Sequence, residues 1–227
     1  MIEALRESGF FAIALTLGAF CIGAAVQKKW KIAILNPILT GAALVMVVLW
    51  LLDIPVEQYQ ADCAPLTYLM TPATICLAIA CYDQLQKLKK HLLAITLSVL
   101  GGVLSSLLSV WLLAKLFQFS HITTISLLPK SVTTAIGIAI SQQAGGIGAL
   151  TTAVIVITGI FGNVAGPFLC KLFHLNDPVS QGVAYGTASH VVGTSRANEI
   201  STLTGAVSSL SLTLSGLITT IILSFLL

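Results

Sequence analysis

Charged residues are scarce in this sequence. They make up 8% of the 227 residues, whereas hydrophobic residues make up 56%. A soluble domain normally carries about 25% charged residues, so this chain lacks the polarity that a water-facing surface needs. The mean hydropathy of +0.99 agrees with this. The composition excludes an ordinary soluble domain and predicts an all-α polytopic membrane protein surrounded by a lipid bilayer.

Motifs of catalysis and of metal binding are also missing. The sequence contains no GxSxG, no HExxH and no pair of acidic residues spaced for acid–base work. Of the five cysteines, four lie inside apolar runs and none forms a CxxC pair, which is typical of small packing residues. We therefore predict no enzyme activity, no metal site and no cofactor.

The basic residues gather between apolar runs instead of forming a stripe, which argues against binding to nucleic acid. Their two clusters are QKKWK at 27–31 and KLKKH at 87–91, and the positive-inside rule places both in the cytoplasm. The N-terminal MIEALRESGF lacks the basic start of a cleavable signal peptide. We therefore expect the first apolar run to remain in the mature protein.

Several apolar segments approach the roughly 20 residues that a spanning helix needs. The third, fifth and seventh segments are interrupted, at Pro72, Pro129 and Gly186, and Asn36 with Pro37 marks a kink in the second. We expect about eight hydrophobic segments, some of them broken or re-entrant. They lie at 10–26, 32–52, 65–82, 92–117, 125–141, 149–173, 181–196 and 203–227.

The two halves of the chain resemble each other in the order of these segments. When residues 119–227 are laid over residues 1–118, Ala73 meets Ala188 and Thr74 meets Ser189. We predict two structural repeats within one membrane unit, which are inverted if one broken segment in each half is re-entrant. Interrupted segments at corresponding places are the sequence feature that best indicates a transporter's binding site.

The stretch GTASHVVGTSRANE at 186–199 concentrates polar residues in an otherwise apolar chain. A broken helix frees backbone groups that find no water in the bilayer core, so it has to line protein or a wet cavity. We therefore expect the breaks at Pro129 and Gly186 to meet near the midplane of the membrane.

The break at Pro129 would supply the positive end of a helix. Because proline favours the first helical turn, Pro129 is expected to begin a half-helix that carries Lys130, Ser131, Thr133 and Thr134. An ammonium, hydroxyls and unpaired backbone N–H groups at such an end would bind a small carboxylate anion.

The break in the seventh segment would supply the other side of this site. Thr187 and Ser189 would cap a second half-helix. His190 and Thr194, four residues apart, share one face of that half-helix. Arg196 would bind the carboxylate with two hydrogen bonds.

Each of these residues also has a structural interpretation. Arg196 and Glu199 would form an ion pair at the membrane surface, and Lys130 would extend to the interface from a helix end. His190 would be a hydrogen-bonded packing residue, and Gly193, counted here with the helix break, would let two helices approach closely. Ionisable residues inside a membrane are costly, so the set as a whole favours a function.

Six stretches carry distinctive patterns: LLPKSVTTAIGIAISQQAGGI at 127–147, GIFGNVAGP at 159–167, YGTASHVVGTSRANE at 185–199, GAVSSLSL at 205–212, ILNPIL at 34–39 and TPATICLA at 71–78. These stretches resemble the LrgB/CidB family of bacterial membrane proteins, and the likeness covers nearly the whole chain. The sequence departs from the usual family pattern at Thr71, where glycine is common, and at Ala80 and Ala135, where proline is common.

The resemblance implies a multi-pass protein of the bacterial cytoplasmic (inner) membrane. Bacterial members are described as antiholin-like regulators of murein hydrolase export and autolysis, encoded with a small LrgA/CidA-type partner. The related plastid protein is a glycolate/glycerate translocator, and some bacterial members are linked to pyruvate uptake. Small carriers of this kind often form homo-oligomers, and we expect a dimer.

Two hypotheses follow from the residues and from the resemblance. The main one is a secondary transporter that moves small monocarboxylates of the pyruvate, glycolate or glycerate class by alternating access. The alternative is an antiholin-like regulator that acts with an LrgA/CidA-type partner and needs no small ligand.

Overall fold

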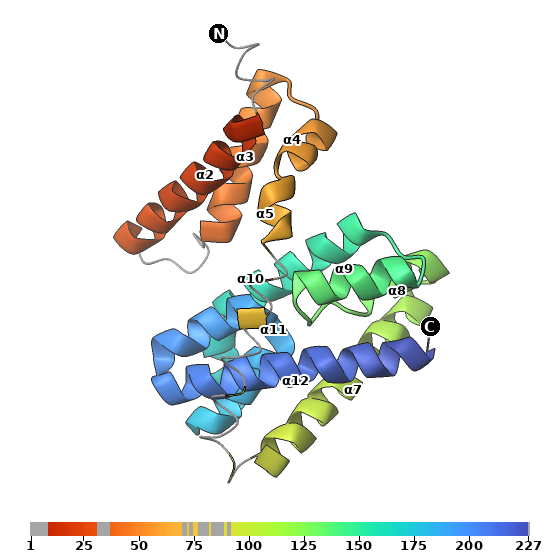
Figure 1. The fold of residues 1–227 in the computed structure, drawn as a ribbon. Helices are drawn as coiled ribbons and strands as arrows, with labels where there is room; N and C mark the ends of the chain where they lie inside the picture. The colour runs from red at the N-terminus through yellow and green to blue at the C-terminus, as the bar shows by residue number, and fades with distance from the viewer. Residues whose placement is uncertain are drawn as a thin grey trace. The chain divides into compact units, whose positions relative to one another are not determined.

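The computed structural model describes residues 9–30, 37–69 and 92–226, and the single residues 72, 75, 76, 82 and 89. All regular structure in these residues is helical, as the composition predicts (Figure 1). The chain divides into two compact units, Met1–Ile75 and Cys76–Leu227. This division is based on contacts within the chain, so it does not test the two repeats expected at 1–118 and 119–227. The repeats stay a prediction.

The first unit is built on a helical hairpin of α2 (Gly9–Trp30) and α3 (Pro37–Leu52). The two helices approach closely, because a Cβ atom at Gly41 would lie 3.4 Å from the carbonyl oxygen of Ala19. Buried Val45 and neighbouring apolar residues complete the interface. Small residues thus set the distance between these helices, as is usual for packing inside membranes.

The hairpin is followed by a sharp turn. Asp53 adopts a left-handed backbone with φ of 52°, and α4 (Val56–Asp62) runs at 119° to α3. The hydroxyl oxygens of Thr16 in α2 and Tyr59 in α4 lie 2.7 Å apart. This hydrogen bond ties α4 to α2, and the short α5 (Ala64–Tyr68) follows.

The second unit packs around one face of α7. Its helices are α7 (Leu92–Leu116), α8 (His121–Leu127), α9 (Thr134–Gln143), α10 (Gly148–Leu172), α11 (Pro178–Ile200) and α12 (Thr202–Leu226). On α7 the buried residues recur every three or four positions, which places them on one helix face. The core consists of Ile95, Val99, Val103 and Leu107 from α7, Ile140 from α9, and Val207, Leu210 and Leu223 from α12. Other faces of α7 expose large apolar side chains, which suits contact with lipid.

Helices α11 and α12 form a closely packed antiparallel pair (Figure 1). The chain reverses through Ser201, whose backbone is extended and whose Oγ accepts a hydrogen bond of 3.0 Å from the Thr204 N–H. Cβ atoms at Gly182 and Gly186 would lie 2.7 Å and 2.9 Å from side chains of α12. Gly186 therefore serves close packing, and the helix continues through it.

Among the described residues, fewer helices qualify as membrane spans than the eight segments expected from the whole sequence. Four described helices, α2, α7, α10 and α12, are long and apolar enough to cross a bilayer, and α3 with α4 makes a fifth if the bent pair is one span. The third segment, with its predicted break at Pro72, lies largely outside the described residues, as does Asn36. Pro37 is the first residue of α3.

The fifth segment is broken near Pro129, but its half-helix begins later than predicted. Helix α8 ends at Leu127 and α9 begins only at Thr134. Pro129 follows the C-cap of α8, where proline is common because it cannot continue a helix. Lys130 and Ser131 therefore lie in the connection before α9, and the prediction that they occupy the first turn of a half-helix is wrong.

Candidate functional site

The seventh segment is broken three residues beyond the glycine at which we expected the break. Ser189 (φ −129°, ψ 16°) and His190 (φ 42°, ψ −137°) are non-helical, while α11 is helical on both sides of them. Both side chains are buried. A positive φ in such a residue costs about 1–3 kcal/mol and persists only where the surroundings fix it. The neighbouring helix α10 supplies those surroundings.

Helix α10 holds the break through His190. The Nε2 atom of His190 lies 2.8 Å from the Ile155 carbonyl oxygen, within hydrogen-bonding distance. The imidazole lies against Gly159, where a Cβ atom would lie 2.6 Å from the ring. His190 thus makes the contacts of a hydrogen-bonded packing residue. This agrees with the structural interpretation of His190 given from the sequence.

Further polar groups at the break are bonded to the protein. The Asn163 amide of α10 donates to the Val192 carbonyl oxygen over 3.3 Å. The Thr194 hydroxyl donates to the His190 carbonyl oxygen over 2.9 Å, and it lies 2.9 Å from Ser208 Oγ of α12. These bonds satisfy groups that would otherwise be costly to bury.

A face of glycines on α10 receives the broken part of α11. A Cβ atom at Gly162 would collide with the Ser189 side chain, and one at Gly166 would lie 2.8 Å from the Tyr185 hydroxyl oxygen. Gly193 lies beyond the break in α11 and packs against the part of the same helix before the break. A Cβ atom at Gly193 would lie 2.7 Å from the Tyr185 carbonyl oxygen. The stretch GIFGNVAGP is therefore a docking face for the break.

A pocket of about 910 Å³ with a partly polar lining opens between α7, the connection from α8 to α9, and the first half of α11. We call it the Lys130 pocket. Its polar lining consists mainly of hydroxyl groups, with one ammonium and one carboxylate. These residues are Ser98, Ser105, Ser106 and Ser109 of α7, Lys130 and Ser131 of the connection, and Asp177, Ser180 and Thr187 at α11.

The ammonium of Lys130 binds a hydroxyl but has no counter-charge in the described part of the chain. Its Nζ donates to Ser131 Oγ over 3.1 Å, and Ser131 Oγ lies 3.2 Å from Ser106 Oγ. No described carboxylate lies within ion-pair distance of this ammonium. Asp177 of the same pocket accepts a hydrogen bond of 2.9 Å from the Ser180 N–H. A cation in this position favours an anion or water beside it.

Thr187 brings an unsatisfied hydroxyl to the same pocket. Its side chain is 6% exposed, and its Oγ1 has no hydrogen-bond partner among the described residues. Gly102 of α7 allows this approach, since a Cβ atom there would lie 2.8 Å from Thr187 Cγ2. A small cavity of about 10 Å³ adjoins Thr187, Ser106 and Ser131. That is about the space that one water molecule needs.

The structure brings together three of the residues predicted to bind an anion: Lys130, Ser131 and Thr187 all line the Lys130 pocket. The others lie elsewhere. Thr133 occupies the N-cap position of α9 without a side-chain capping bond, and Thr134 begins the helix. Ser189, His190 and Thr194 belong to the break in α11.

Arg196 does not line the Lys130 pocket. Its guanidinium forms an ion pair with Glu199, and their side chains are 34% and 53% exposed. An ion pair with Glu199 is one of the two roles that the sequence suggests for Arg196. The single positive pocket that we expected to contain both Lys130 and Arg196 is therefore built around Lys130 without Arg196.

The serines of α7 were missed because that segment is apolar overall. Ser98, Ser105 and Ser109 are spaced by seven and four residues, which places them on one helix face. Gly102 lies on the same face. A run of hydroxyls on one side of an expected spanning helix was the signal that pointed to a polar lining.

Comparison with known proteins places the chain in a family. The LrgB-like family model matches residues 16–227. The chain is 31% identical to the protein named holin-like protein CidB of Staphylococcus epidermidis strain RP62A, over 93% of this chain and 92% of the relative. It is 30% identical to the protein of the same name from Staphylococcus aureus strain N315, with the same coverage.

Another relative extends the match to a second genus. The chain is 32% identical to the protein named uncharacterized protein YwbG of Bacillus subtilis strain 168, over 96% of this chain and 97% of the relative. No solved structure matches the chain. Because the family model and these relatives cover nearly the whole sequence, this chain belongs to the LrgB-like family.

Proposed function

We propose that this chain is a holin-like regulator of the bacterial cytoplasmic membrane. In this role it controls murein hydrolase export and autolysis, together with a small LrgA/CidA-type membrane partner. The names of the staphylococcal relatives support the proposal, because those proteins are called holin-like and match this chain along nearly its whole length.

One structural observation carries the proposal: the Lys130 pocket is lined along one side by α7, which is long and apolar enough to span a bilayer. Control of membrane permeability requires polar surface at membrane depth, and ionisable residues there usually mark such paths. The pocket combines Lys130 with serines on one face of α7. A conformational change that opened this surface to both sides would create a polar path.

The proposal is tested in a bacterial strain from which the chain has been deleted. The strain receives the wild-type chain with or without an LrgA/CidA-type partner, and the rate of detergent-induced lysis is followed. We expect the chain to change the lysis rate, and the change to depend on the partner. An unchanged lysis rate in the presence of both proteins would contradict the regulatory role.

A second candidate function is supported by the geometry around Lys130. An ammonium without a counter-charge lies beside Ser131, and the buried Thr187 hydroxyl lacks a partner. A small carboxylate would accept hydrogen bonds from all three groups. This arrangement favours a secondary carrier for monocarboxylates of the pyruvate, glycolate or glycerate class, which works by alternating access.

Transport in proteoliposomes separates the two candidates. A carrier takes up labelled pyruvate or glycolate, and the uptake is lost in Lys130→Met, which keeps the length of the side chain without its charge. The matched control is Lys171→Met, since Lys171 lies exposed in the last turn of α10. Absence of uptake by the wild-type chain, combined with a partner-dependent lysis phenotype, would exclude the carrier and retain only the regulatory role.

A further inference from the structure

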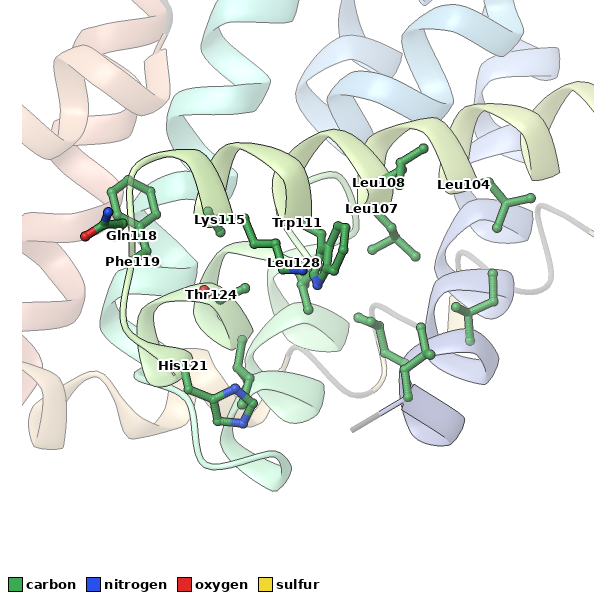
Figure 2. A pocket seen from close by; sticks show the side chains of 15 residues that line it. Leu104, Leu107, Leu108, Trp111, Lys115, Gln118, Phe119, His121, Thr124 and Leu128 are labelled. Carbon is green, nitrogen blue, oxygen red and sulfur yellow. The ribbon is translucent and has the colours of Figure 1, made fainter.

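A second cavity in the unit Cys76–Leu227 is apolar along its length and basic at one end. It has a volume of about 920 Å³ and is lined by α7, the start of α8 and the end of α12 (Figure 2). Leu104, Leu107 and Leu108 line the apolar part, while Lys115 and His121 lie at the basic end. We call this cavity the Trp111 groove, after the indole between the two parts.

The turn after α7 fixes the basic end. Gln118 has a left-handed backbone with φ of 53°, and the Phe119 N–H donates to the Ala114 carbonyl oxygen over 2.9 Å. This tight reversal brings His121, the first residue of α8, to the same end of the groove as Lys115. Figure 2 shows the Lys115 side chain beside Trp111, with His121 projecting from the start of α8.

The groove offers positive charge without a counter-charge. The Lys115 ammonium lies 4.2 Å from the centroid of the Trp111 ring, a contact that orients the ammonium but leaves its charge uncompensated. Among the described residues, no carboxylate lines the groove and none lies within ion-pair distance of Lys115. Lys115 and the imidazole N–H of His121 are donors suited to a phosphate.

The length of the groove matches one leaflet of a bilayer. From Leu104 to Lys115 the α7 axis rises about 16 Å, at 1.5 Å per residue. The hydrocarbon core of a bilayer is about 30 Å thick, so one leaflet contributes about 15 Å. A spanning helix of a partner protein would require a groove along the whole core. A single acyl chain requires only one leaflet.

We propose that the Trp111 groove binds one anionic phospholipid. Its acyl chain lies along Leu104, Leu108 and Trp111, and its phosphate accepts hydrogen bonds from Lys115 and His121. This site is separate from the Lys130 pocket, because the two cavities share no lining residue. The proposal therefore stands independently of the function of the Lys130 pocket.

Native mass spectrometry of the purified full chain tests this site. The protein is titrated with phosphatidylglycerol or phosphatidylcholine that carry identical acyl chains. We expect the wild-type chain to prefer phosphatidylglycerol. We expect the double variant Lys115→Gln, His121→Gln to bind it at least about fivefold more weakly, because one basic residue near a membrane contributes about that factor. Lys171→Gln, which removes an exposed charge outside the groove, is the control and should bind as the wild type does.

A second variant tests the apolar part and does not depend on the charged end. Leu108 is 57% exposed, so Leu108→Trp is tolerated by the core while it fills the groove, and it should weaken the binding of both lipids. Equal binding of phosphatidylglycerol by the double variant and by Lys171→Gln would overturn the proposal. A disulfide between two chains that carry Leu108→Cys would also overturn it, because a second copy would then occupy the groove.

Discussion

The packing of His190 against α10 predicts that two glycine substitutions in long helices differ in their effect on stability. In Gly159→Ala the new methyl group would lie 2.6 Å from the His190 ring and 3.0 Å from Val192 Cβ. In Gly101→Ala, on α7, no atom lies within 4 Å of the new methyl group. Both glycines are inside long helices, so the two variants differ mainly in what the methyl group meets.

The magnitudes follow from these contacts. Overpacking at Gly159 costs about 1–3 kcal/mol, and displacement of His190 from the Ile155 carbonyl loses about 1 kcal/mol more. Replacing glycine by alanine inside a helix stabilises the helix by up to about 1 kcal/mol, which offsets part of this loss. We therefore expect Gly159→Ala to lower the free energy of unfolding by about 2 kcal/mol, a fall of roughly 6 °C in the midpoint. Gly101→Ala should be neutral or slightly stabilising.

Thermal unfolding of the purified variants in detergent, followed by circular dichroism, measures this difference. A double-mutant cycle identifies the cause of the destabilisation. If the methyl group meets the imidazole, Gly159→Ala should lower the free energy of unfolding much less in a His190→Ala background. If Gly159→Ala melts at the same temperature as Gly101→Ala, the contact of α10 with His190 does not hold the break in α11.

Two further predictions concern stability. Thr151 Oγ1 lies 2.7 Å from Ser141 Oγ and 3.0 Å from the Ser126 carbonyl oxygen, all buried. Thr151→Val should therefore lower the free energy of unfolding by about 1–3 kcal/mol. Thr152→Val, next to it, removes only a bond within its own helix and should cost clearly less in the same melting experiment. Arg196→Gln removes an exposed ion pair, so the unfolding free energy should change by less than about 1 kcal/mol. Uptake of labelled carboxylate, if the wild type shows it, should persist in Arg196→Gln, and its loss would place Arg196 in the site after all.

The sequence predicted the class of fold and the approximate extents of its longest helices. The segments expected at 10–26, 92–117, 149–173 and 203–227 correspond to α2, α7, α10 and α12, whose ends differ by a few residues. Long apolar runs define such helices because the bilayer sets their length. The count of eight segments was not confirmed, since short and broken helices have no comparable signal.

The positions of the two breaks depend on contacts that no local pattern records. Proline both begins helices and follows their ends, so Pro129 alone did not show that α9 starts at Thr134. Gly186 suggested a break, but its role is to let α12 approach. The break itself lies at Ser189 and His190, where α10 supplies the compensating contacts.

The candidate site was predicted in part. Lys130, Ser131 and Thr187 were named from the sequence and share one pocket. Arg196 was added because it is a strong carboxylate binder, but Glu199, three residues further along the helix, takes its guanidinium. The serines of α7 were overlooked because they occupy one face of a segment whose average hydropathy is that of an apolar helix.

Both candidate functions require that the Lys130 pocket contain water when the protein is in the membrane. The most direct test replaces the five natural cysteines and introduces Ser105→Cys or Leu104→Cys, neighbours at one depth of α7. Ser105 lines the Lys130 pocket, whereas Leu104 is 50% exposed and lines the apolar Trp111 groove. In intact membranes, a charged thiol reagent is predicted to label Ser105→Cys rapidly and Leu104→Cys hardly at all. Equal labelling of the two variants, or no labelling of Ser105→Cys, would show that the Lys130 pocket is not hydrated.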